Sequence, residues 1–186
     1  MAAALPLTAR FHRALVYAAR VHARQFRKGT TRPYIGHLLG VTSIVLTHGG
    51  DEDEAIAALL HDAVEDQGGK PRLREIRRKF SGRVARIVAG CTDSDVEPNP
   101  PWLERKTEYL RHLRRADSSV RLVSAADKLY NARETLEDCA RTARRCGNDS
   151  RAASRELCGI TAKWERYCGA KVLRSWPRSS SAWCEN

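Results

Sequence analysis

The chain has 186 residues, 42% hydrophobic and 30% charged, a composition typical of one soluble globular domain with a buried core. It has no run of about 18 apolar residues and no signal-peptide core, so we expect a cytoplasmic protein without a membrane span. The net charge of +11 suits an anionic ligand, whereas the aromatic content of 6% and the lack of a recognised motif argue against a nucleic-acid partner. The sequence indicates no oligomeric state.

Apolar residues recur at helical spacing through most of the chain, and no alternating strand pattern persists, so the predicted fold class is all-α. The first helix is expected to begin after Thr8 as its N-cap and to carry the apolar series at 11–26. A loop containing two glycines and a proline follows at 27–36. A second helix is predicted at 37–48.

The remaining elements are also predicted to be helical. Asp51 and Glu54 are spaced as a capping pair for a third helix, which carries the segment ALLHDAVEDQGG at 58–69. Further helices are expected at 73–80, 83–91, 102–116, 119–139 and 149–175. We therefore predict a single helical bundle over residues 1–176, followed by a polar tail at 177–186.

The third predicted helix places four ionisable residues in an otherwise apolar segment. An α-helix turns by about 100° per residue, so these residues fall on one face. They are His61, Asp62, Glu65 and Asp66. One interpretation is an ordinary amphipathic helix with a solvated acidic face. The adjacent imidazole and carboxylate, with two more carboxylates one turn later, instead favour a site for a divalent cation.

Polar residues on two other predicted helices extend this pattern. Asp127 lies among apolar residues with Asn131 one turn later, and His37 begins the second helix. Each of these residues alone is more often a structural hydrogen-bonding group. In an antiparallel bundle, however, His37, Asp127 and the His61-Asp62 pair can converge. Two imidazoles and two carboxylates suit Mn²⁺, Fe²⁺ or Zn²⁺, with coordination positions left open for hydrolysis.

The segments that hold these residues resemble a known family. The order His, His-Asp and distant Asp resembles that of the HD phosphohydrolase superfamily. The segments VHARQFRKGTTRPYIGH, AALLHDAVED and AADKLYNARE closely resemble the hydrolase domain of the RelA/SpoT enzymes. They are most similar to the single-domain small alarmone hydrolases, the group that includes the metazoan SpoT homologue. The likeness covers roughly residues 11–136.

The resemblance implies an HD-domain fold, one Mn²⁺ ion on the four candidate ligands, and removal of the 3′-pyrophosphate from ppGpp or pppGpp to give GDP or GTP. Glu65 and Asp66 match the catalytic acidic pair of the family. Arg27 and Lys28 match a basic pair that lies against the base and phosphates, and Asn131 matches a nucleotide-contacting residue. Two alternatives stay open: hydrolysis of another nucleotide such as NADPH, and a non-catalytic HD nucleotide-binding module.

Two positions depart from the family pattern. Leu38 stands where the family often has proline after the first metal-binding histidine, and Gln67 stands where it often has threonine after the acidic pair. Neither position is a candidate ligand. We therefore expect the departures to affect the local loop geometry and the substrate preference rather than metal binding.

Overall fold

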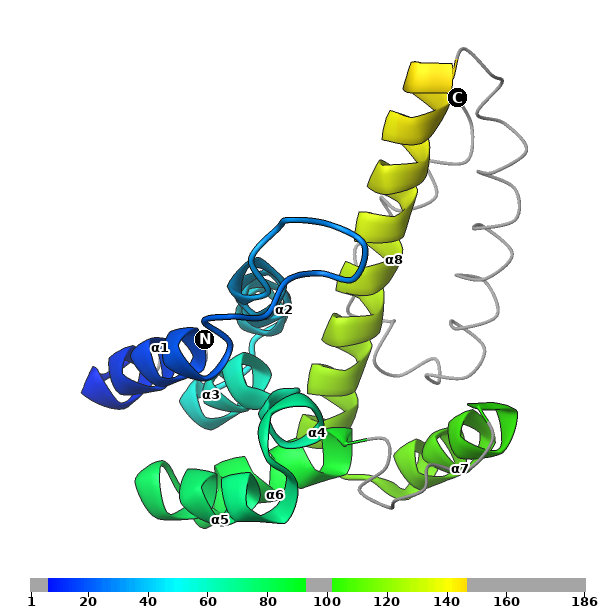
Figure 1. Ribbon diagram of the computed structural model, residues 1–186. Helices are drawn as coiled ribbons and strands as arrows, with labels where there is room; N and C mark the ends of the chain where they lie inside the picture. Colours follow the sequence, from blue (N-terminus) through cyan, green and yellow to red (C-terminus); the bar gives the residue numbers. More distant parts are fainter. Residues whose placement is uncertain (1–6, 93–101, 147–186) are drawn as a thin grey trace. The chain divides into compact units, whose positions relative to one another are not determined.

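The computed structural model describes residues 7–92 and 102–146, with side chains described at 7–92 and 107–138. Within these ranges the chain forms eight helices and one isolated antiparallel bridge, which confirms the predicted all-α class (Figure 1). The helices are α1 (Ala9–Val21), α2 (Ile35–Thr47), α3 (Glu52–Leu60), α4 (Ala63–Gln67), α5 (Gly69–Lys79), α6 (Gly82–Cys91), α7 (Trp102–Arg115) and α8 (Ser118–Cys146). No helix in the described part of the chain is both long and apolar enough to cross a membrane.

The chain divides into two units, Met1–Ala126 and Asp127–Asn186, and the division falls inside the continuous helix α8. The first unit contains α1 to α7 and the beginning of α8. The described part of the second unit is the rest of α8. The single domain expected over 1–176 stays a prediction. The helix and the tail expected at 149–175 and 177–186 lie outside the described residues.

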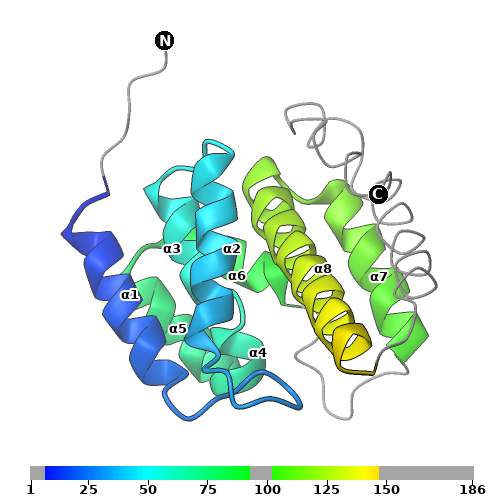
Figure 2. The same cartoon turned by 90° about the horizontal axis from the view of Figure 1, so that it is seen from above.

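Helix α3 forms the centre of the core of the first unit. Every residue from Ala55 to Leu60 is fully buried. The helix packs against α1, α2 and α6, and α5 in turn packs against both α4 and α6 (Figure 2). Because α3 leads directly into His61, burial of this helix fixes the backbone at the start of the His-Asp motif.

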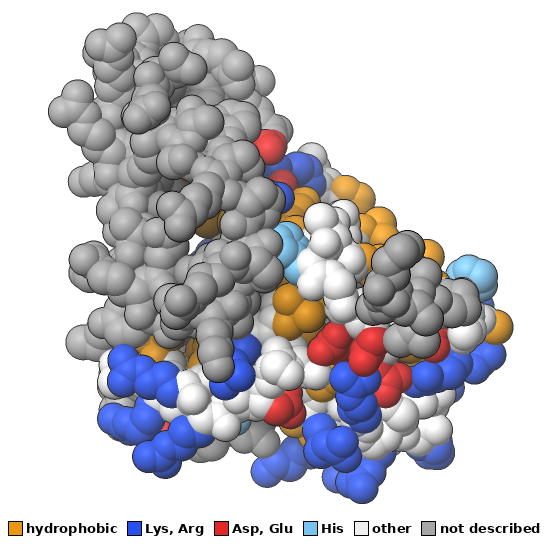
Figure 3. All heavy atoms as spheres, turned by 180° about the vertical axis from the view of Figure 1, so that it is seen from behind, with side chains coloured by type: hydrophobic (Ala, Val, Ile, Leu, Met, Phe, Trp, Pro, Cys, Tyr) orange, Lys and Arg blue, Asp and Glu red, His pale blue; other side chains and the backbone are white. Residues whose placement is uncertain are grey.

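The first turn of α3 is held by a capping box, as the sequence predicts. The Asp51 carboxylate accepts a hydrogen bond from the Glu54 backbone at 3.0 Å, and the Glu54 carboxylate accepts one from the Asp51 backbone at 2.8 Å. Arg83 contacts Asp51 at 2.6 Å, and Arg10 contacts Glu52 at 3.2 Å. On the face shown in Figure 3, acidic side chains lie next to Lys and Arg side chains. Part of the basic charge therefore neutralises this acidic turn.

Helix α1 is shorter than predicted, although its Thr8 cap is confirmed. The helix ends at Val21, and the chain then turns back so that Phe26 forms the isolated bridge with Pro33. Gly29 lies in this loop with φ +73°, a left-handed conformation that glycine adopts without steric cost. Phe26, which the apolar pattern assigns to the helix, is instead 54% exposed in the loop.

Replacement of Leu59 by Ala is expected to lower the free energy of unfolding by about 2–5 kcal/mol. Leu59 is fully buried on α3, so truncation leaves a cavity among three packed helices. Chemical denaturation followed by circular dichroism measures the change. Leu39, which is 45% exposed on α2, provides the matched control, and Leu39→Ala is expected to cost less than about 0.5 kcal/mol. Equal losses in the two variants would contradict the central position of α3.

Candidate metal centre

The segment that carries the His-Asp pair is not one helix, so that sequence-based prediction is wrong. Helix α3 ends at Leu60, His61 and Asp62 form a turn, and α4 follows. The Asp62 backbone has φ −91° and ψ −6°, away from the helical ψ of about −42°. The interruption separates the four ionisable side chains by exposure: His61 is buried, Asp62 is half-buried, and Glu65 and Asp66 are exposed.

The protonation of the His61 ring is set by a backbone contact. Its Nδ1 lies 2.9 Å from the carbonyl oxygen of Ala58, and a carbonyl only accepts, so Nδ1 carries the hydrogen. In the neutral ring the lone pair is then on Nε2, which lies 3.0 Å from Asp62 Oδ2. Two acceptor atoms this close repel each other unless a positive charge lies near both. This arrangement fits a bound cation.

The Asp62 carboxylate contacts three aromatic side chains. Its Oδ2 accepts a hydrogen bond from the Tyr34 hydroxyl at 2.6 Å and lies 3.5 Å from His37 Nε2. His37 is 2% exposed on α2, and its ring centroid lies 5.4 Å from that of His61. The structure thus brings His37, His61 and Asp62 together within the first unit. Sequence reasoning missed Tyr34, although it precedes His37 by three residues in the same segment.

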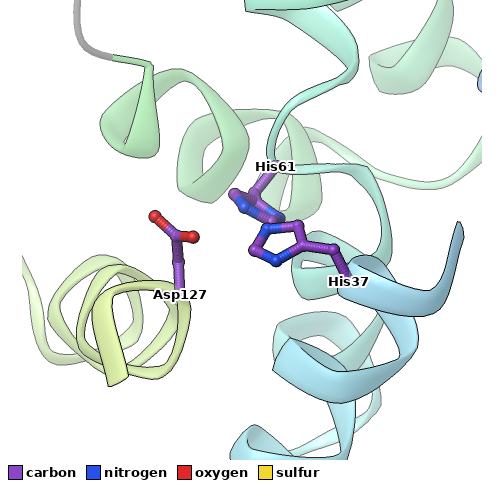
Figure 4. A group of neighbouring side chains, drawn as sticks. All are labelled: His37, His61 and Asp127. Atoms are coloured by element: carbon purple, nitrogen blue, oxygen red, sulfur yellow. The ribbon is translucent and has the colours of Figure 1, made fainter. Parts of the chain in front are cut away.

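Asp127 is the first residue of the second unit, in the middle of α8. It is 6% exposed, and its carboxylate contacts Lys128 Nζ and Asn131 Nδ2, each at 2.6 Å. Figure 4 shows the side chains of His37 and His61 in the first unit and that of Asp127 on α8. Asn131 thus orients Asp127, and its contact with a nucleotide stays a prediction.

The donor set fits a divalent cation. Imidazole nitrogens combined with carboxylate oxygens suit borderline ions such as Mn²⁺, Fe²⁺ and Zn²⁺. Within the first unit, Asp62 contacts both imidazoles. Tyr34 and Asn131 each hold a carboxylate by a hydrogen bond, as the outer neighbours of metal ligands commonly do.

The acidic pair on α4 is tied to the loop after α1. Asp66 Oδ2 accepts a hydrogen bond from Gln25 Nε2 at 2.7 Å. Gln25 Oε1 lies 2.7 Å from Gln67 Nε2 and 2.6 Å from His22 Nδ1. His22 is 3% exposed, and burial lowers its pKa, an effect that the hydrogen bond to Gln25 partly opposes. Glu65, the other member of the pair, is exposed to solvent.

The same loop carries the basic pair predicted to hold the substrate. The Arg27 guanidinium lies over the Tyr34 ring, 5.8 Å from its centroid, and Arg27 N donates to the Arg32 carbonyl at 2.9 Å. Lys28 is exposed. Because the Tyr34 hydroxyl contacts Asp62, Arg27 is placed one side chain away from the candidate metal ligands.

Comparisons with known proteins identify a family and several relatives with similar sequences. The family model described as HD domain matches residues 14–153. Guanosine-3′,5′-bis(diphosphate) 3′-pyrophosphohydrolase MESH1 of Xenopus tropicalis is 40% identical over 126 residues, which cover 66% of this chain and 67% of that protein. The protein of the same name from Homo sapiens is 40% identical over 123 residues, 63% of this chain and 65% of its own length.

Longer enzymes and a solved structure match as well. A probable GTP pyrophosphokinase of Mycobacterium leprae is 35% identical over 152 residues, which cover 73% of this chain but 19% of that enzyme. A solved structure, described as a metazoan ortholog of SpoT that hydrolyses ppGpp, has a TM-score of 0.63 and 32% sequence identity. That match covers 73% of this chain and 74% of the other.

Proposed function

The chain belongs to the HD domain family, and we propose that it is a metal-dependent enzyme that removes the 3′-pyrophosphate from ppGpp or pppGpp. The reaction adds water across the ester bond between ribose and pyrophosphate and gives GDP or GTP. The main support for this proposal is that two buried imidazoles contact the Asp62 carboxylate, next to an acidic pair and a basic loop. Relatives named for this activity, at 40% identity, support the choice of substrate.

We propose one Mn²⁺ ion, although other divalent ions suit the same donors. The proposed ligands are His37, His61, Asp62 and Asp127. When bound, the ion supplies Lewis acidity toward water and a phosphoryl oxygen. The chain prepares its ligands: the Ala58 carbonyl sets the tautomer of His61, the Tyr34 hydroxyl orients Asp62, and the Asn131 amide orients Asp127.

Glu65 is the proposed proton acceptor. It lies on α4 directly after the His-Asp turn, and its exposed side chain is within reach of solvent water. A carboxylate at this position can accept a proton from the attacking water or orient that water. Asp66 is adjacent and is held by Gln25, so we propose that it steadies the attacking water beside Glu65. Two neighbouring carboxylates can also share a proton during the reaction.

Arg27 and Lys28 are the proposed substrate-binding pair. A planar guanidinium can contact an aromatic ring on each of its two faces, so Arg27 can lie between Tyr34 and a guanine base. The exposed Lys28 next to it suits a phosphate group. A guanosine that carries a 3′-diphosphate presents both a base and a polyanion to this pair. A nucleotide substrate also fits the cytoplasmic location proposed from the sequence.

Arg27→Ala is expected to raise KM for ppGpp by about 2- to 30-fold and to change kcat less, because it removes binding without touching the proposed metal ligands. Steady-state kinetics over a range of ppGpp concentrations separates the two constants. Arg24, an exposed arginine in the same loop, provides the control, and Arg24→Ala should leave KM within about twofold. A drop in kcat at unchanged KM would contradict a substrate-binding role for Arg27.

Comparison of substrates tests the proposed function against its alternatives. We expect kcat/KM for ppGpp to exceed that for NADPH, measured with the same protein and the same concentration of Mn²⁺. A ratio that favours NADPH would leave a metal-dependent nucleotide phosphohydrolase of different specificity. Nucleotide binding without turnover of either compound would instead support the non-catalytic module and contradict the proposal.

A further inference from the structure

A series of side-chain hydrogen bonds links the buried end of α1 to the exposed acidic pair. It runs from His22 through Gln25 to Asp66, with Gln67 as a second contact of Gln25. All four residues belong to the first unit. Gln25 and Asp66 are 41 residues apart in the sequence, so the fold rather than local structure brings them together.

The charge of Asp66 determines the direction of every hydrogen bond in this group. An ionised carboxylate only accepts, so the Gln25 atom facing Asp66 must be the amide nitrogen. The Gln25 oxygen then faces His22 and Gln67, which must both donate to it, through Nδ1–H and Nε2–H. A reversed Gln25 amide would place two acceptors 2.7 Å apart and would also lose both donors. Only one orientation of the Gln25 amide satisfies all three neighbours.

The two ends of this group differ in exposure. His22 is 3% exposed and its ring stacks on Tyr34, with centroids 5.4 Å apart and planes 25° apart. Asp66 is exposed, so water competes for its oxygens and a loosely held donor would add little. A donor anchored on a buried ring is already in position, and less conformational entropy is lost when it binds the carboxylate.

We propose that Gln25 is a positioning residue for the Asp66 carboxylate, and that Gln67 and His22 together fix the orientation of its amide. The proposal rests on the proposed function, in which Asp66 belongs to the acidic pair. Gln67 reaches Gln25 Oε1 with its amide nitrogen. A threonine side chain at this position would be two bonds shorter and would not place a donor at the same point.

Gln25→Ala is expected to lower kcat for pyrophosphate release from ppGpp by about 10- to 100-fold, because a misplaced reacting group loses rate rather than binding. KM and the bound metal should stay within about twofold of the wild type. Gln25→Glu keeps the shape of the side chain but removes the donor, so it should lose at least as much rate as Gln25→Ala. A Gln25→Glu variant with wild-type kcat would overturn the proposal in favour of a packing role.

Gln67→Thr tests the second part of the proposal. It removes one of the two donors to Gln25 Oε1 and leaves His22, so its loss of kcat should be smaller than that of Gln25→Ala. Arg24→Gln, which changes an exposed side chain next to Gln25, is the matched control and should leave kcat within about twofold. A larger loss of kcat in Gln67→Thr than in Gln25→Ala would contradict the proposal that Gln67 acts on Asp66 only through Gln25.

A double-mutant cycle separates positioning from a general effect on the fold. If Gln25 acts through Asp66, Gln25→Ala should not lower the residual rate of an Asp66→Ala enzyme any further. The same fold loss in both backgrounds would show that Gln25 acts elsewhere. Urea unfolding of the same four proteins provides a readout that needs no activity. We expect the effect of the two substitutions together on the unfolding equilibrium constant to differ from the product of their separate effects by about two- to tenfold.

The two readouts distinguish failure of this proposal from failure of the proposed function. A wild-type protein that does not hydrolyse ppGpp, but whose unfolding shows this non-additive effect, would contradict the proposed function and support the contact between Gln25 and Asp66. Additive effects on unfolding, together with additive effects on kcat, would overturn the positioning role while leaving the hydrolase activity in place.

Discussion

Replacement of Glu65 by Gln is expected to lower kcat for pyrophosphate release by about 10²- to 10⁴-fold, the usual contribution of a general base. The variant keeps the shape of the side chain but cannot accept a proton. Glu65 is exposed on the short helix α4, so the substitution should leave the fold intact. Steady-state kinetics with ppGpp and a circular dichroism spectrum measure the two effects.

Metal content identifies the origin of that loss. Because Glu65 is not a proposed ligand, Glu65→Gln should bind as much divalent metal as the wild type. Glu108, which is exposed on α7, provides the matched control, and Glu108→Gln should turn over within about twofold of the wild type. Wild-type turnover in Glu65→Gln would show that Glu65 is only a surface residue of α4.

Asp127→Ala is expected to lose bound metal and activity together. The Asp127 carboxylate is buried, and its removal takes away a proposed anionic ligand. We expect the affinity for Mn²⁺ to fall by more than about 100-fold, beyond the usual effect of changing an outer neighbour of a ligand. Elemental analysis after desalting and assays at rising Mn²⁺ concentrations measure the two losses.

Asn131→Ala, which removes only the amide that orients Asp127, should fall between the wild type and Asp127→Ala in metal affinity. An Asp127→Ala protein that keeps its full metal content would mean that the ion, if bound, is held elsewhere.

Local signals in the sequence were sufficient to predict much of the fold. Thr8 and the pair Asp51 and Glu54 predict the starts of α1 and α3 because capping depends on residues at most three positions apart. The family resemblance, carried by the His-Asp motif and the segments around it, is confirmed by the HD domain match. Motifs of this kind are readable because each one is continuous in the chain.

Features that depend on distant contacts were not predictable in the same way. The periodicity of apolar residues extends the first helix to Phe26, but the return of the chain from Phe26 to Pro33 ends it at Val21. Helical spacing likewise runs through His61, whereas the backbone turns there. A periodic pattern records which residues could share a helical face, and it does not show where a loop or a turn replaces the helix.

Some residues of the candidate site could be predicted from their residue type, and others could be recognised only from their contacts in the structure. His37, His61, Asp62 and Asp127 are unusual in apolar surroundings, so the sequence marks them, and their role as ligands stays a prediction. Tyr34 could not be recognised in this way, because a tyrosine near a loop is common in proteins. Its role is visible only from the hydrogen bond that its hydroxyl donates to Asp62. Gln67 was visible as a departure from the family, but its contact with Gln25 is visible only in the fold.

Pyrophosphate release from ppGpp by the purified, metal-stripped protein, measured before and after addition of Mn²⁺, tests the proposed activity most directly. We expect no release before the ion is added, and afterwards equal amounts of GDP and pyrophosphate, with the rate reduced about 10²- to 10⁴-fold in Glu65→Gln. Absence of pyrophosphate in the presence of Mn²⁺, or release at an equal rate by the metal-stripped protein, would contradict a metal-dependent 3′-pyrophosphohydrolase.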